Sequence, residues 1–340
     1  MKILILRFSS IGDIVLTTPV VRGLKQQLKA TVHYLTKVAY QPVLQANPYI
    51  DQLWSFRKEP DEVLPQLKAE QYDVVIDLHN NLRSLRLQLA LRRPQRRFRK
   101  LNWQKWLMVR FKTNRLPDLH IVDRYFETVL SLGIQNDGKG LDYYYQLPDG
   151  SGAAYAAQVL KATSADALPA YLAIGVGAAH YTKRIPKEKL LAICHAATCP
   201  VVLLGGPEEK ETGAWLAEHS AAHVVNTCGQ TTLSETAALI EHARVVLSPD
   251  TGVMHMAAAF QRPLVVLWGN TIPDFGMYPY YKRGVNHWKA FEVKDLPCRP
   301  CSKIGFDQCP KGHFSCMQQH SVSAVMEVVG QLWQAEERWQ

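Results

Sequence analysis

Short apolar runs alternate with segments of helical period along most of the chain. In the first half, strands are predicted at residues 2–8, 32–35, 53–56 and 74–78, and helices at residues 61–70, 82–91, 103–111 and 122–132. The second half repeats the pattern, with strands at residues 171–177, 201–204, 224–225, 245–247 and 264–267 and helices at residues 187–197 and 233–242. Strands that alternate with helices predict an α/β fold, in which helices cover both faces of parallel sheets.

The alternation breaks off between the two halves. Residues 136–152 are rich in Gly, Asp and Tyr and have no helical period, which predicts a domain boundary. We therefore expect one Rossmann-like domain over residues 1–150 and a second over residues 151–320, facing each other across a cleft. Residues 268–317 carry few regular signals and are expected to be loops. Residues 322–339 carry an apolar stripe, and we expect this C-terminal helix, within residues 321–340, to pack back toward the N-terminal domain.

A polar turn follows the first predicted strand. Asp13 stands in this turn after Gly12, at the carboxyl end of the strand, where open parallel sheets bind ligands. Its carboxylate is a candidate general base, and the alternative role is that of a helix cap. The following helix begins either at Pro19, with Thr18 as its cap, or near Gly12 with a bend at Pro19.

A second polar turn, at residues 248–252, joins a strand to a helix of small apolar residues. Unpaired N–H groups and the helix dipole at such a helix start form an anion site suited to phosphate. Thr251 adds a hydroxyl and His255, one turn later, adds an imidazole. The alternative is an ordinary capped helix, with Asp250 or Thr251 as the cap and His255 as a satisfied surface histidine.

Two other strand ends of the second half carry charged residues. Lys183 lies in the loop after residues 171–177, and a lysine there can hold phosphate and neutralise a leaving diphosphate. Glu208 and Glu209 follow a Gly-Gly-Pro turn after residues 201–204, where an acid often accepts hydrogen bonds from ribose hydroxyls. Their alternative role is the favourable placement of negative charge at a helix start, worth about 0.3–1 kcal/mol.

The net charge of +9 arises from one segment. Residues 78–117 contain twelve Lys or Arg and no Asp or Glu, and the rest of the chain contains 27 basic and 30 acidic residues. Aromatic residues, among them Trp103 and Trp106, are interleaved with this basic block. The block can meet nucleic acid, an anionic membrane face or an acidic substrate, and the alternative is a solvated face without a partner.

The remaining composition excludes several classes of protein. No apolar run approaches the roughly 18 residues that are needed to cross a bilayer. The apolar run at residues 1–7 is too short for the core of a signal peptide, so we expect a cytoplasmic protein. The first strand is not followed by G-x-G-x-x-G, and the chain has no Walker lysine motif, which weighs against a nicotinamide dehydrogenase and a P-loop NTPase.

Seven cysteines without an export signal favour reduced thiols. Four of them lie close together in the sequence: Cys298, Cys301, Cys309 and Cys316. The first pair has zinc-knuckle spacing and the second does not, so a structural zinc site is one hypothesis. Reduced thiols packed in a loop-rich tail, or a redox-labile cluster, are the others.

Four segments taken together resemble glycosyltransferase family 9, the heptosyltransferases of the bacterial lipopolysaccharide inner core. They read ILRFSSIGDIVLTTP at residues 5–19, HYTKRIP at 180–186, LGGPEE at 204–209 and DTGVMHMAAA at 250–259. The resemblance runs nearly end to end and rests on the order and spacing of the segments. It implies a GT-B fold with the acceptor on the N-terminal domain and an ADP-activated sugar on the C-terminal domain. It also implies an inverting transfer without a metal ion or other cofactor.

The resemblance assigns roles to residues of this chain. Asp13 would deprotonate the acceptor hydroxyl and Lys183 would pair with the donor diphosphate. Glu209, or its neighbour Glu208, would hold the ribose. Thr251, Gly252 and His255 would bind the donor phosphates, and Asp250 would also belong to the donor nucleotide site. The acceptor would be bound by Ser9, Ser10, Gly12, Arg92, Arg93, Arg96 and Arg97.

Family acceptors are acidic, phosphorylated lipid sugars at the inner face of the cytoplasmic membrane, so the resemblance implies a peripheral membrane enzyme that does not bind nucleic acid. Two alternatives remain open: a sugar-nucleotide epimerase or hydrolase of the same fold, and a zinc-containing nucleic-acid-binding protein.

Overall fold

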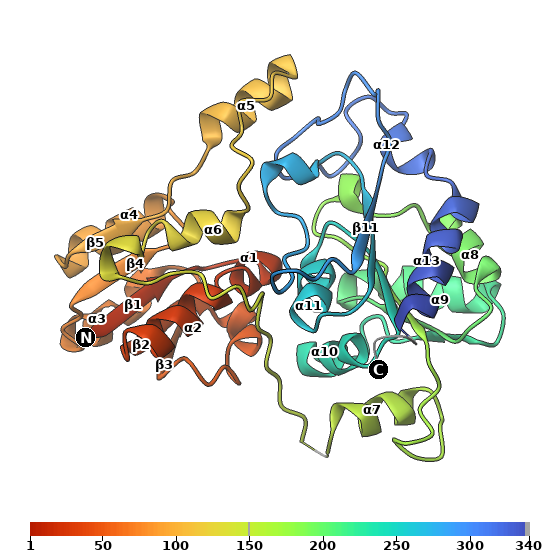
Figure 1. The fold of residues 1–340 in the computed structure, drawn as a ribbon, viewed down its shortest axis with the longest axis horizontal. Helices are drawn as coiled ribbons and strands as arrows, with labels where there is room; N and C mark the ends of the chain where they lie inside the picture. Colours follow the sequence, from red (N-terminus) through yellow and green to blue (C-terminus); the bar gives the residue numbers. More distant parts are fainter. Residues whose placement is uncertain (149, 337–340) are drawn as a thin grey trace. The chain divides into compact units, whose positions relative to one another are not determined.

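The computed structural model describes residues 1–148 and 150–336, which form two compact units (Figure 1). The first unit contains Met1–Leu101 and Asp118–Gln146. The second contains Asn102–Pro117 and the chain from Leu147 onward. Asn102–Pro117, which lies within the basic block, is thus an excursion from the first unit that folds with the second.

The first unit is built on a parallel sheet of strand order β3-β2-β1-β4-β5. Its strands are β1 (Lys2–Leu6), β2 (Thr31–Lys37), β3 (Gln52–Phe56), β4 (Val74–Asp77) and β5 (Gln95–Arg97). Its helices are α1 (Ile11–Val15), α2 (Thr18–Gln27), α3 (Leu64–Ala69), α4 (Leu82–Leu91) and α6 (Ile121–Phe126). Shorter 3₁₀ turns are η1 (Val38–Val43), η2 (Pro60–Val63) and η3 (Leu130–Leu132).

The second unit is built on a parallel sheet of strand order β11-β10-β9-β6-β7-β8. Its strands are β6 (Leu172–Gly175), β7 (Val201–Leu204), β8 (Val224–Asn226), β9 (Val245–Pro249), β10 (Leu264–Trp268) and β11 (Trp288–Glu292). Its helices are α5 (Asn102–Phe111), α7 (Gly152–Val159), α8 (Lys187–Ala196), α9 (Lys210–His219), α10 (Leu233–Glu241), α11 (Gly252–Ala259), α12 (Ser315–Gln318) and α13 (Val322–Glu336). Its 3₁₀ turns are η4 (Tyr181–Lys183), η5 (Pro207–Glu209) and η6 (Pro273–Phe275).

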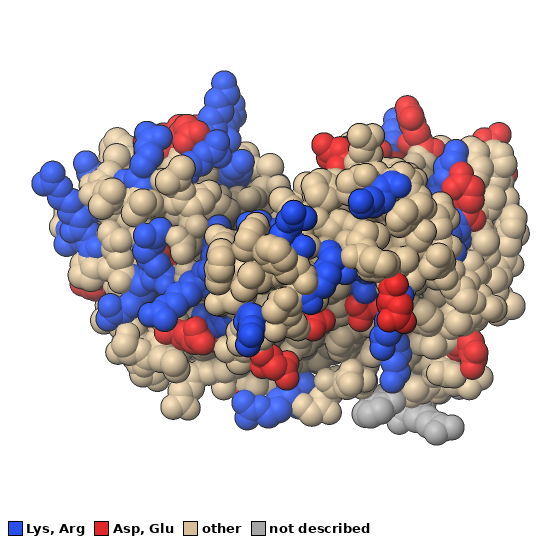
Figure 2. All heavy atoms as spheres, turned by 90° about the horizontal axis from the view of Figure 1, so that it is seen from above, with Lys and Arg blue, Asp and Glu red and all other residues tan. Residues whose placement is uncertain are grey.

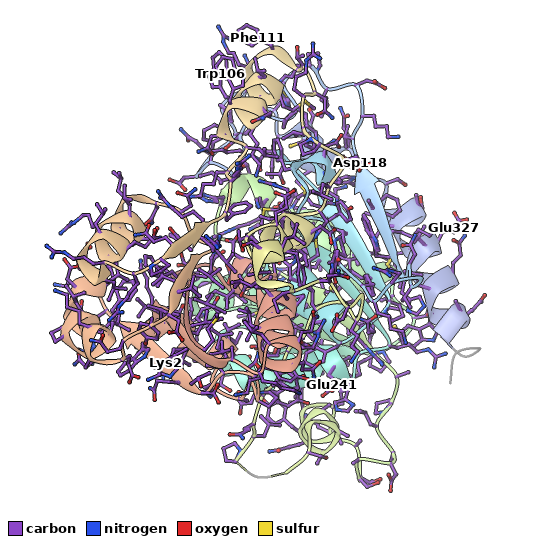
Figure 3. The ribbon with its side chains drawn as sticks, turned by 60° about the vertical axis from the view of Figure 1, so that its left-hand side comes forward. Lys2, Trp106, Phe111, Asp118, Glu241 and Glu327 are labelled. Atoms are coloured by element: carbon purple, nitrogen blue, oxygen red, sulfur yellow. The ribbon has the colours of Figure 1, made fainter. Side chains whose placement is uncertain are left out.

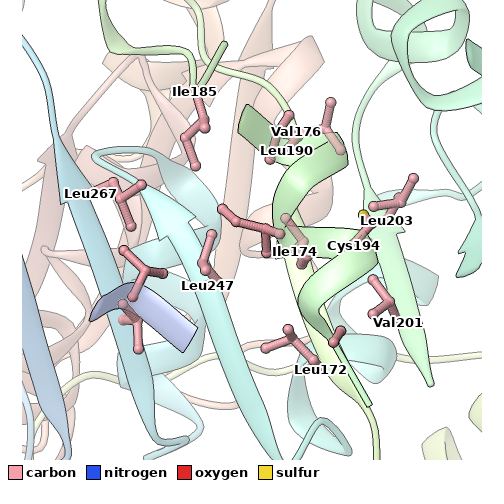
Figure 4. Packing of buried hydrophobic residues seen from close by; sticks show 14 of the residues in the cluster. Leu172, Ile174, Val176, Ile185, Leu190, Cys194, Val201, Leu203, Leu247 and Leu267 are labelled. Atoms are coloured by element: carbon pink, nitrogen blue, oxygen red, sulfur yellow. The ribbon is translucent and has the colours of Figure 1, made fainter. Parts of the chain in front are cut away.

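Apolar side chains of the central strands form the core of each unit. In the second unit, Ile174 of β6 and Leu247 of β9 are fully buried and meet Leu190 of α8 in one cluster (Figure 4). In the first unit, Leu4 and Leu6 of β1 occupy the equivalent place. These strands are continuous apolar runs because helices cover both faces of a parallel sheet. The predicted α/β class is confirmed.

Some elements differ from the prediction. The segment after β1 forms two helices, α1 and α2, separated by a turn, with Thr17 at the N-cap of α2 and Pro19 in its first turn. The helix predicted to Leu132 ends at Phe126 as α6. The stretch 268–317, expected to be loops, contains the edge strand β11 and the start of α12, so this prediction was wrong in part.

The C-terminal helix α13 packs against α8, β9 and β10 of the second unit. Val325 and Val329 of the predicted apolar stripe are buried in that core. The stripe was predicted to run to Trp339, which lies outside the described residues. Among the described residues, no helix is both long enough and apolar enough to cross a membrane.

Candidate active site

Asp13 lies at the switch point of the first sheet. The strand order reverses between β1 and β4, and the register pairs Leu6 at the end of β1 with Asp77 at the end of β4. Ligands of open α/β sheets bind at such a point, outside the carboxyl ends of the strands. Asp13 stands in α1, the first helix after β1, with its side chain 22% exposed.

A buried arginine holds the Asp13 carboxylate. Arg7 Nη2 lies 2.7 Å from Asp13 Oδ1, while Arg7 Nη1 donates to Leu78 O at 2.7 Å and to the Tyr125 hydroxyl at 3.1 Å. Burial alone lowers the pKa of Arg7, but the charges of its neighbours, Asp13 foremost, outweigh burial and raise it. Arg7 therefore stays charged and fixes the position of the carboxylate.

The other Asp13 oxygen accepts from Ser10. Its Oδ2 lies 3.2 Å from Ser10 N and 2.9 Å from Ser10 Oγ, so Asp13 is also part of a capping box at the start of α1. The capping role considered from the sequence is therefore present, and the role of general base stays a prediction. Ser9 O accepts from Arg7 Nε at 2.9 Å, and Gly12 is buried in α1. The acceptor-binding role of these residues also stays a prediction.

His79, which the sequence analysis missed, follows β4 at the same edge of the sheet. Its ring lies 4.8 Å from that of Phe8, and its Nδ1 is buried without a hydrogen-bond partner among the described residues. Burial, followed by the charge of Arg7, lowers the pKa of His79 to about 3. His79 is therefore neutral at physiological pH and can add a hydrogen bond, but no charge, beside Asp13.

In the second unit, Lys183 and Asp250 form an ion pair across the switch point. Lys183 follows β6 and Asp250 follows β9, the neighbouring strand on which the order reverses. Lys183 Nζ lies 2.6 Å from Asp250 Oδ2, which also accepts from Thr271 Oγ1 at 2.8 Å. The strand-end argument thus brings these groups together, and their roles toward a nucleotide stay predictions.

The start of α11 retains its N–H groups. Thr251 occupies the N-cap position, but neither it nor another side chain within the described residues caps the helix. The Thr251 hydroxyl instead lies 3.1 Å from Ser248 Oγ, and the Asp250 carboxylate binds Lys183. The first turn, starting at Gly252, is therefore suited to an anion. His255 is buried in the same helix rather than at the surface.

Two glycines make room for Glu209. A Cβ atom on Gly177, after β6, would overlap the Glu209 carboxylate, and a Cβ atom on Gly205 would lie 2.7 Å from Glu209 Cβ. Glu209 Oε2 accepts from Gly206 N at 2.9 Å, so the predicted helix-start role is present as well. The side chain of Glu209 is 12% exposed and that of Glu208 is 78% exposed, so Glu209 is the acid directed into this edge of the sheet.

Asn270 is a second residue that the sequence analysis did not assign. It follows β10 beside Thr271 and is 1% exposed, yet neither polar atom of its side-chain amide has a hydrogen-bond partner among the described residues. An unpaired buried amide is costly, which makes it a candidate ligand-binding group. The sequence signal was a pair of polar residues one glycine after an apolar strand.

The four predicted anion-binding arginines do not form one cluster. Arg97, on β5, donates to Asn80 Oδ1 at 2.6 Å, whereas the side chain of Arg93 donates to Gln71. Arg92 ends α4 in the left-handed conformation, and both it and Arg96 are exposed. Only Arg97 of the four lines the pocket described next.

An open pocket of about 370 Å³ in the first unit is lined by Arg97, Arg99, Arg124, Glu127 and Thr128. The Arg124 guanidinium lies 4.9 Å from the Phe98 ring centre and donates to Arg99 O at 2.8 Å. Burial lowers the pKa of Arg124, and the nearby charge of Glu127, which lines the same pocket, offsets this only in part. Arg124 comes from α6, outside the basic block, so the sequence pattern did not place it with the others.

The surface in Figure 2 shows Lys and Arg outnumbering Asp and Glu over its left-hand part.

All seven cysteines are free thiols. Cys298 Sγ lies 3.8 Å from His313 Nε2. Burial, followed by the neighbouring Cys298, raises the pKa of Cys301 to about 12, and burial raises that of Cys316 to about 11. Among the residues that the structure describes, no group of three or more His, Cys, Asp or Glu side chains is arranged to hold a metal ion. The zinc, reduced-thiol and redox-labile hypotheses for these cysteines, Cys309 included, therefore stay predictions.

The chain is similar to known proteins over most of its length. The model of glycosyltransferase family 9 (heptosyltransferase) matches residues 62–304. Lipooligosaccharide heptosyltransferase 2 of Haemophilus ducreyi is 28% identical over 305 residues, covering 81% of this chain and 85% of that protein. Lipopolysaccharide heptosyltransferase 3 of Escherichia coli is 24% identical over 313 residues, covering 85% and 88%.

Solved structures are similar over nearly the whole length. The glycosyltransferase family 9 protein of Veillonella parvula superposes with a TM-score of 0.78 at 22% identity, covering 98% of this chain and 97% of that chain. ADP-heptose lipopolysaccharide heptosyltransferase II of E. coli superposes with a TM-score of 0.73 at 20% identity, covering 99% and 100%.

Two parallel-sheet units, each with polar groups at its switch point, and these structural neighbours define a GT-B fold, and the family match makes the protein a glycosyltransferase. The chain belongs to glycosyltransferase family 9. The predicted fold, family and enzyme class are confirmed. The predicted absence of nucleic-acid binding stays a prediction. The domain boundaries and the cleft between the domains stay predictions.

The packing of Glu209 against Gly177 can be tested by stability. Because an added methyl group would overlap the Glu209 carboxylate and displace it from its hydrogen bond with Gly206 N, we expect Gly177→Ala to lower the free energy of unfolding by about 0.5–1.5 kcal/mol in urea denaturation. Gly206→Ala is the matched control, since the atom nearest to its new Cβ would be Glu209 Oε2, at an ordinary 3.5 Å. Equal stability of the two variants would contradict this placement of Glu209.

Proposed function

We propose that the chain transfers a heptose from ADP-heptose to an acidic acceptor of the lipopolysaccharide inner core, with inversion at the anomeric carbon. The observation that carries the proposal is the anion-binding edge of the second sheet, where Lys183 and the uncapped start of α11 flank one switch point. Family membership supports the reaction class. Related E. coli structures support the donor, since heptosyltransferase WaaC was solved with ADP and with ADP-2-deoxy-2-fluoro heptose.

The donor-binding roles follow from the chemistry of each group. Lys183 pairs with the diphosphate as a point charge, and the N–H groups from Gly252 onward donate to its oxygens. Glu209 accepts hydrogen bonds from the ribose hydroxyls. When a diphosphate takes Lys183, Asp250 keeps the hydrogen bond from Thr271, so its carboxylate is not left without a donor. His255, in the same helix, completes the phosphate site.

The reaction is a single displacement. Asp13 accepts the proton of the acceptor hydroxyl while that oxygen forms a bond to the anomeric carbon, and the bond from this carbon to the β-phosphate oxygen breaks. The electron pair of the broken bond leaves with ADP, where Lys183 and the α11 N–H groups stabilise the charge. This scheme consumes the ADP-sugar as a substrate and requires no further cofactor.

The acceptor is bound by cations of the first unit. The Arg97, Arg99 and Arg124 pocket suits the phosphate or carboxylate groups of a lipid-A-core sugar. Such an acceptor is membrane-embedded, so the enzyme works in the cytoplasm at the inner face of the membrane as a peripheral protein. The excess of basic residues in the block 78–117 supports this location.

The function is tested by a donor screen with purified protein and lipid-A-core acceptors, which measures nucleotide release and the mass of the product. We expect acceptor-dependent release of ADP from ADP-heptose and an acceptor heavier by one heptosyl residue. Release of ADP at the same rate without acceptor would indicate a hydrolase and would overturn the proposal.

Asp13→Asn removes the proton acceptor while nearly keeping the shape of the side chain. We expect kcat to fall by about 10²–10⁴-fold, the usual contribution of a general base. The affinity for ADP, measured by calorimetry, should be unchanged. Ser10→Ala is the control, because it removes one hydrogen bond to Asp13 and leaves the Arg7 pair. Combined loss of transfer and ADP binding in Asp13→Asn would count against a base role.

Lys183→Met removes the cation expected at the diphosphate. We expect ADP to bind about 10–100-fold more weakly, because hydrogen bonds to charged groups contribute about 1.5–3 kcal/mol each. Lys187→Met is the control, since Lys187 Nζ lies over the Trp215 ring, 4.5 Å from its centre. If both variants bind ADP like the parent protein, Lys183 is not part of the donor site.

The contribution of the arginine pocket to acceptor binding can be distinguished from that of the overall positive charge of residues 78–117. The double variant Arg97→Gln, Arg99→Gln should raise the acceptor KM at least about tenfold, because a tenfold change corresponds to the loss of one charge-assisted hydrogen bond. Arg92→Gln with Arg96→Gln removes the same charge outside the pocket and should have a smaller effect. The donor KM should stay constant in both double variants. Equal effects on the acceptor KM would show that only the net charge of the block matters.

A further inference from the structure

Helix α5 has apolar side chains but no buried ones. All its residues are described, and none is buried. Trp103 is 64% exposed, Trp106 47% and Phe111 59%. An amphipathic helix of a folded protein normally turns its apolar side chains toward a core, and a cluster of exposed large aromatic residues marks an interaction surface. Figure 3 shows Trp106 and Phe111 on the outer side of α5.

The polar groups of this segment hold it to the second unit. Lys112 Nζ donates to Pro300 O at 2.8 Å and to Cys298 O at 3.2 Å. Asn114 Nδ2 donates to Asp274 Oδ1 at 3.0 Å. Polar side chains just after α5 thus attach it to the second unit. Leu107, Met108 and Val109 of the helix are half-buried, whereas its large aromatic side chains remain exposed.

The aromatic side chains already contact one another. The rings of Trp103 and Trp106 are stacked with centres 4.9 Å apart, and the Phe111 ring meets Trp106 edge-on at 5.3 Å. A preassembled cluster loses little conformational freedom on binding. Mutual stacking also covers one face of each indole, which leaves less room for the base stacking that single-stranded nucleic acid requires.

Basic side chains surround the cluster. The segment 102–117 contains Lys105, Arg110, Lys112 and Arg115 and no acidic residue. The neighbouring loop adds Ile304, which is 55% exposed, next to Lys303, whose Nζ donates to Asn102 Oδ1 at 3.3 Å. Indole rings favour the headgroup region of a bilayer, and cations beside them are attracted to anionic lipid. The chemistry of the surface therefore matches an anionic lipid bilayer.

We propose that α5 is the membrane-binding element of this protein and that its aromatic side chains enter the headgroup region of an anionic bilayer. This inference rests on the proposed function, in which the enzyme works at the membrane surface, and it assigns membrane binding to one segment of the chain. It separates membrane binding, by α5 of the second unit, from acceptor recognition by the arginine pocket of the first unit.

The test is co-sedimentation of the full-length protein with vesicles of phosphatidylethanolamine and phosphatidylglycerol. We expect the triple variant Trp103→Ser, Trp106→Ser, Phe111→Ser to bind at least tenfold more weakly. The control variant Val38→Ser, Leu130→Ser changes exposed apolar residues elsewhere, which are 41% and 56% exposed, and should bind like the parent protein. Vesicles of phosphatidylcholine alone should bind the parent protein weakly. Unchanged binding by the triple variant would overturn the inference.

A second variant tests insertion without removing the aromatic surface. In vesicles with brominated acyl chains, tryptophan fluorescence of the parent protein should be quenched. Trp103→Phe with Trp106→Phe should still co-sediment but should lose most of the quenching. Quenching that persists in this double variant would contradict membrane insertion. Stronger binding of the parent protein to a single-stranded oligonucleotide than to vesicles would also contradict it. Transfer to a detergent-solubilised acceptor should be equal in parent and triple variant, and failure of transfer in both would overturn the proposed function but not this inference.

Discussion

The ion pair between Arg7 and Asp13 determines the geometry of the first unit. Arg7 is nearly buried and binds Asp13 from α1, Leu78 O after β4 and Tyr125 from α6, so one guanidinium joins three elements. A buried charge that loses its partner costs about 3–5 kcal/mol. The position of the Asp13 carboxylate is thus fixed by contacts with several packed elements at the sheet edge, and not by one loop alone.

The ion pair of the second unit has a different character. Lys183 and Asp250 have side chains that are 18% and 10% exposed, and Asp250 has an additional donor in Thr271. Lys183 can therefore exchange its carboxylate for a phosphate, whereas Arg7 has no such freedom. In the proposed mechanism, Arg7 would be a fixed cation beside the candidate base, and Lys183 an exchangeable cation that stabilises the charge of the leaving group.

The sequence predicted the features that depend on local pattern. Continuous apolar runs marked the central strands, and the common edge of parallel strands brought Lys183 and Asp250 together. The strand β11 was missed because it is a short edge strand of exposed and half-buried residues, without an apolar run. Arg124 and Asn270 were missed because their surroundings are made by tertiary contacts. The polar attachment of α5 could not be predicted, since the acceptor groups for Lys112 are backbone carbonyls of a distant loop.

The excursion Asn102–Pro117 also constrains how the protein can be divided. The chain passes between the units at residues 101–102, 117–118 and 146–147. A fragment that starts at Leu147 would lack Lys112 and Asn114, whose side chains donate to Pro300 O and to Asp274 Oδ1. It would also expose the part of the cysteine-bearing loop that Lys112 contacts. Chimeras that exchange the second unit between family members therefore have to carry two separate segments of the chain. Natural exchange of this unit between related proteins would also have to transfer both segments.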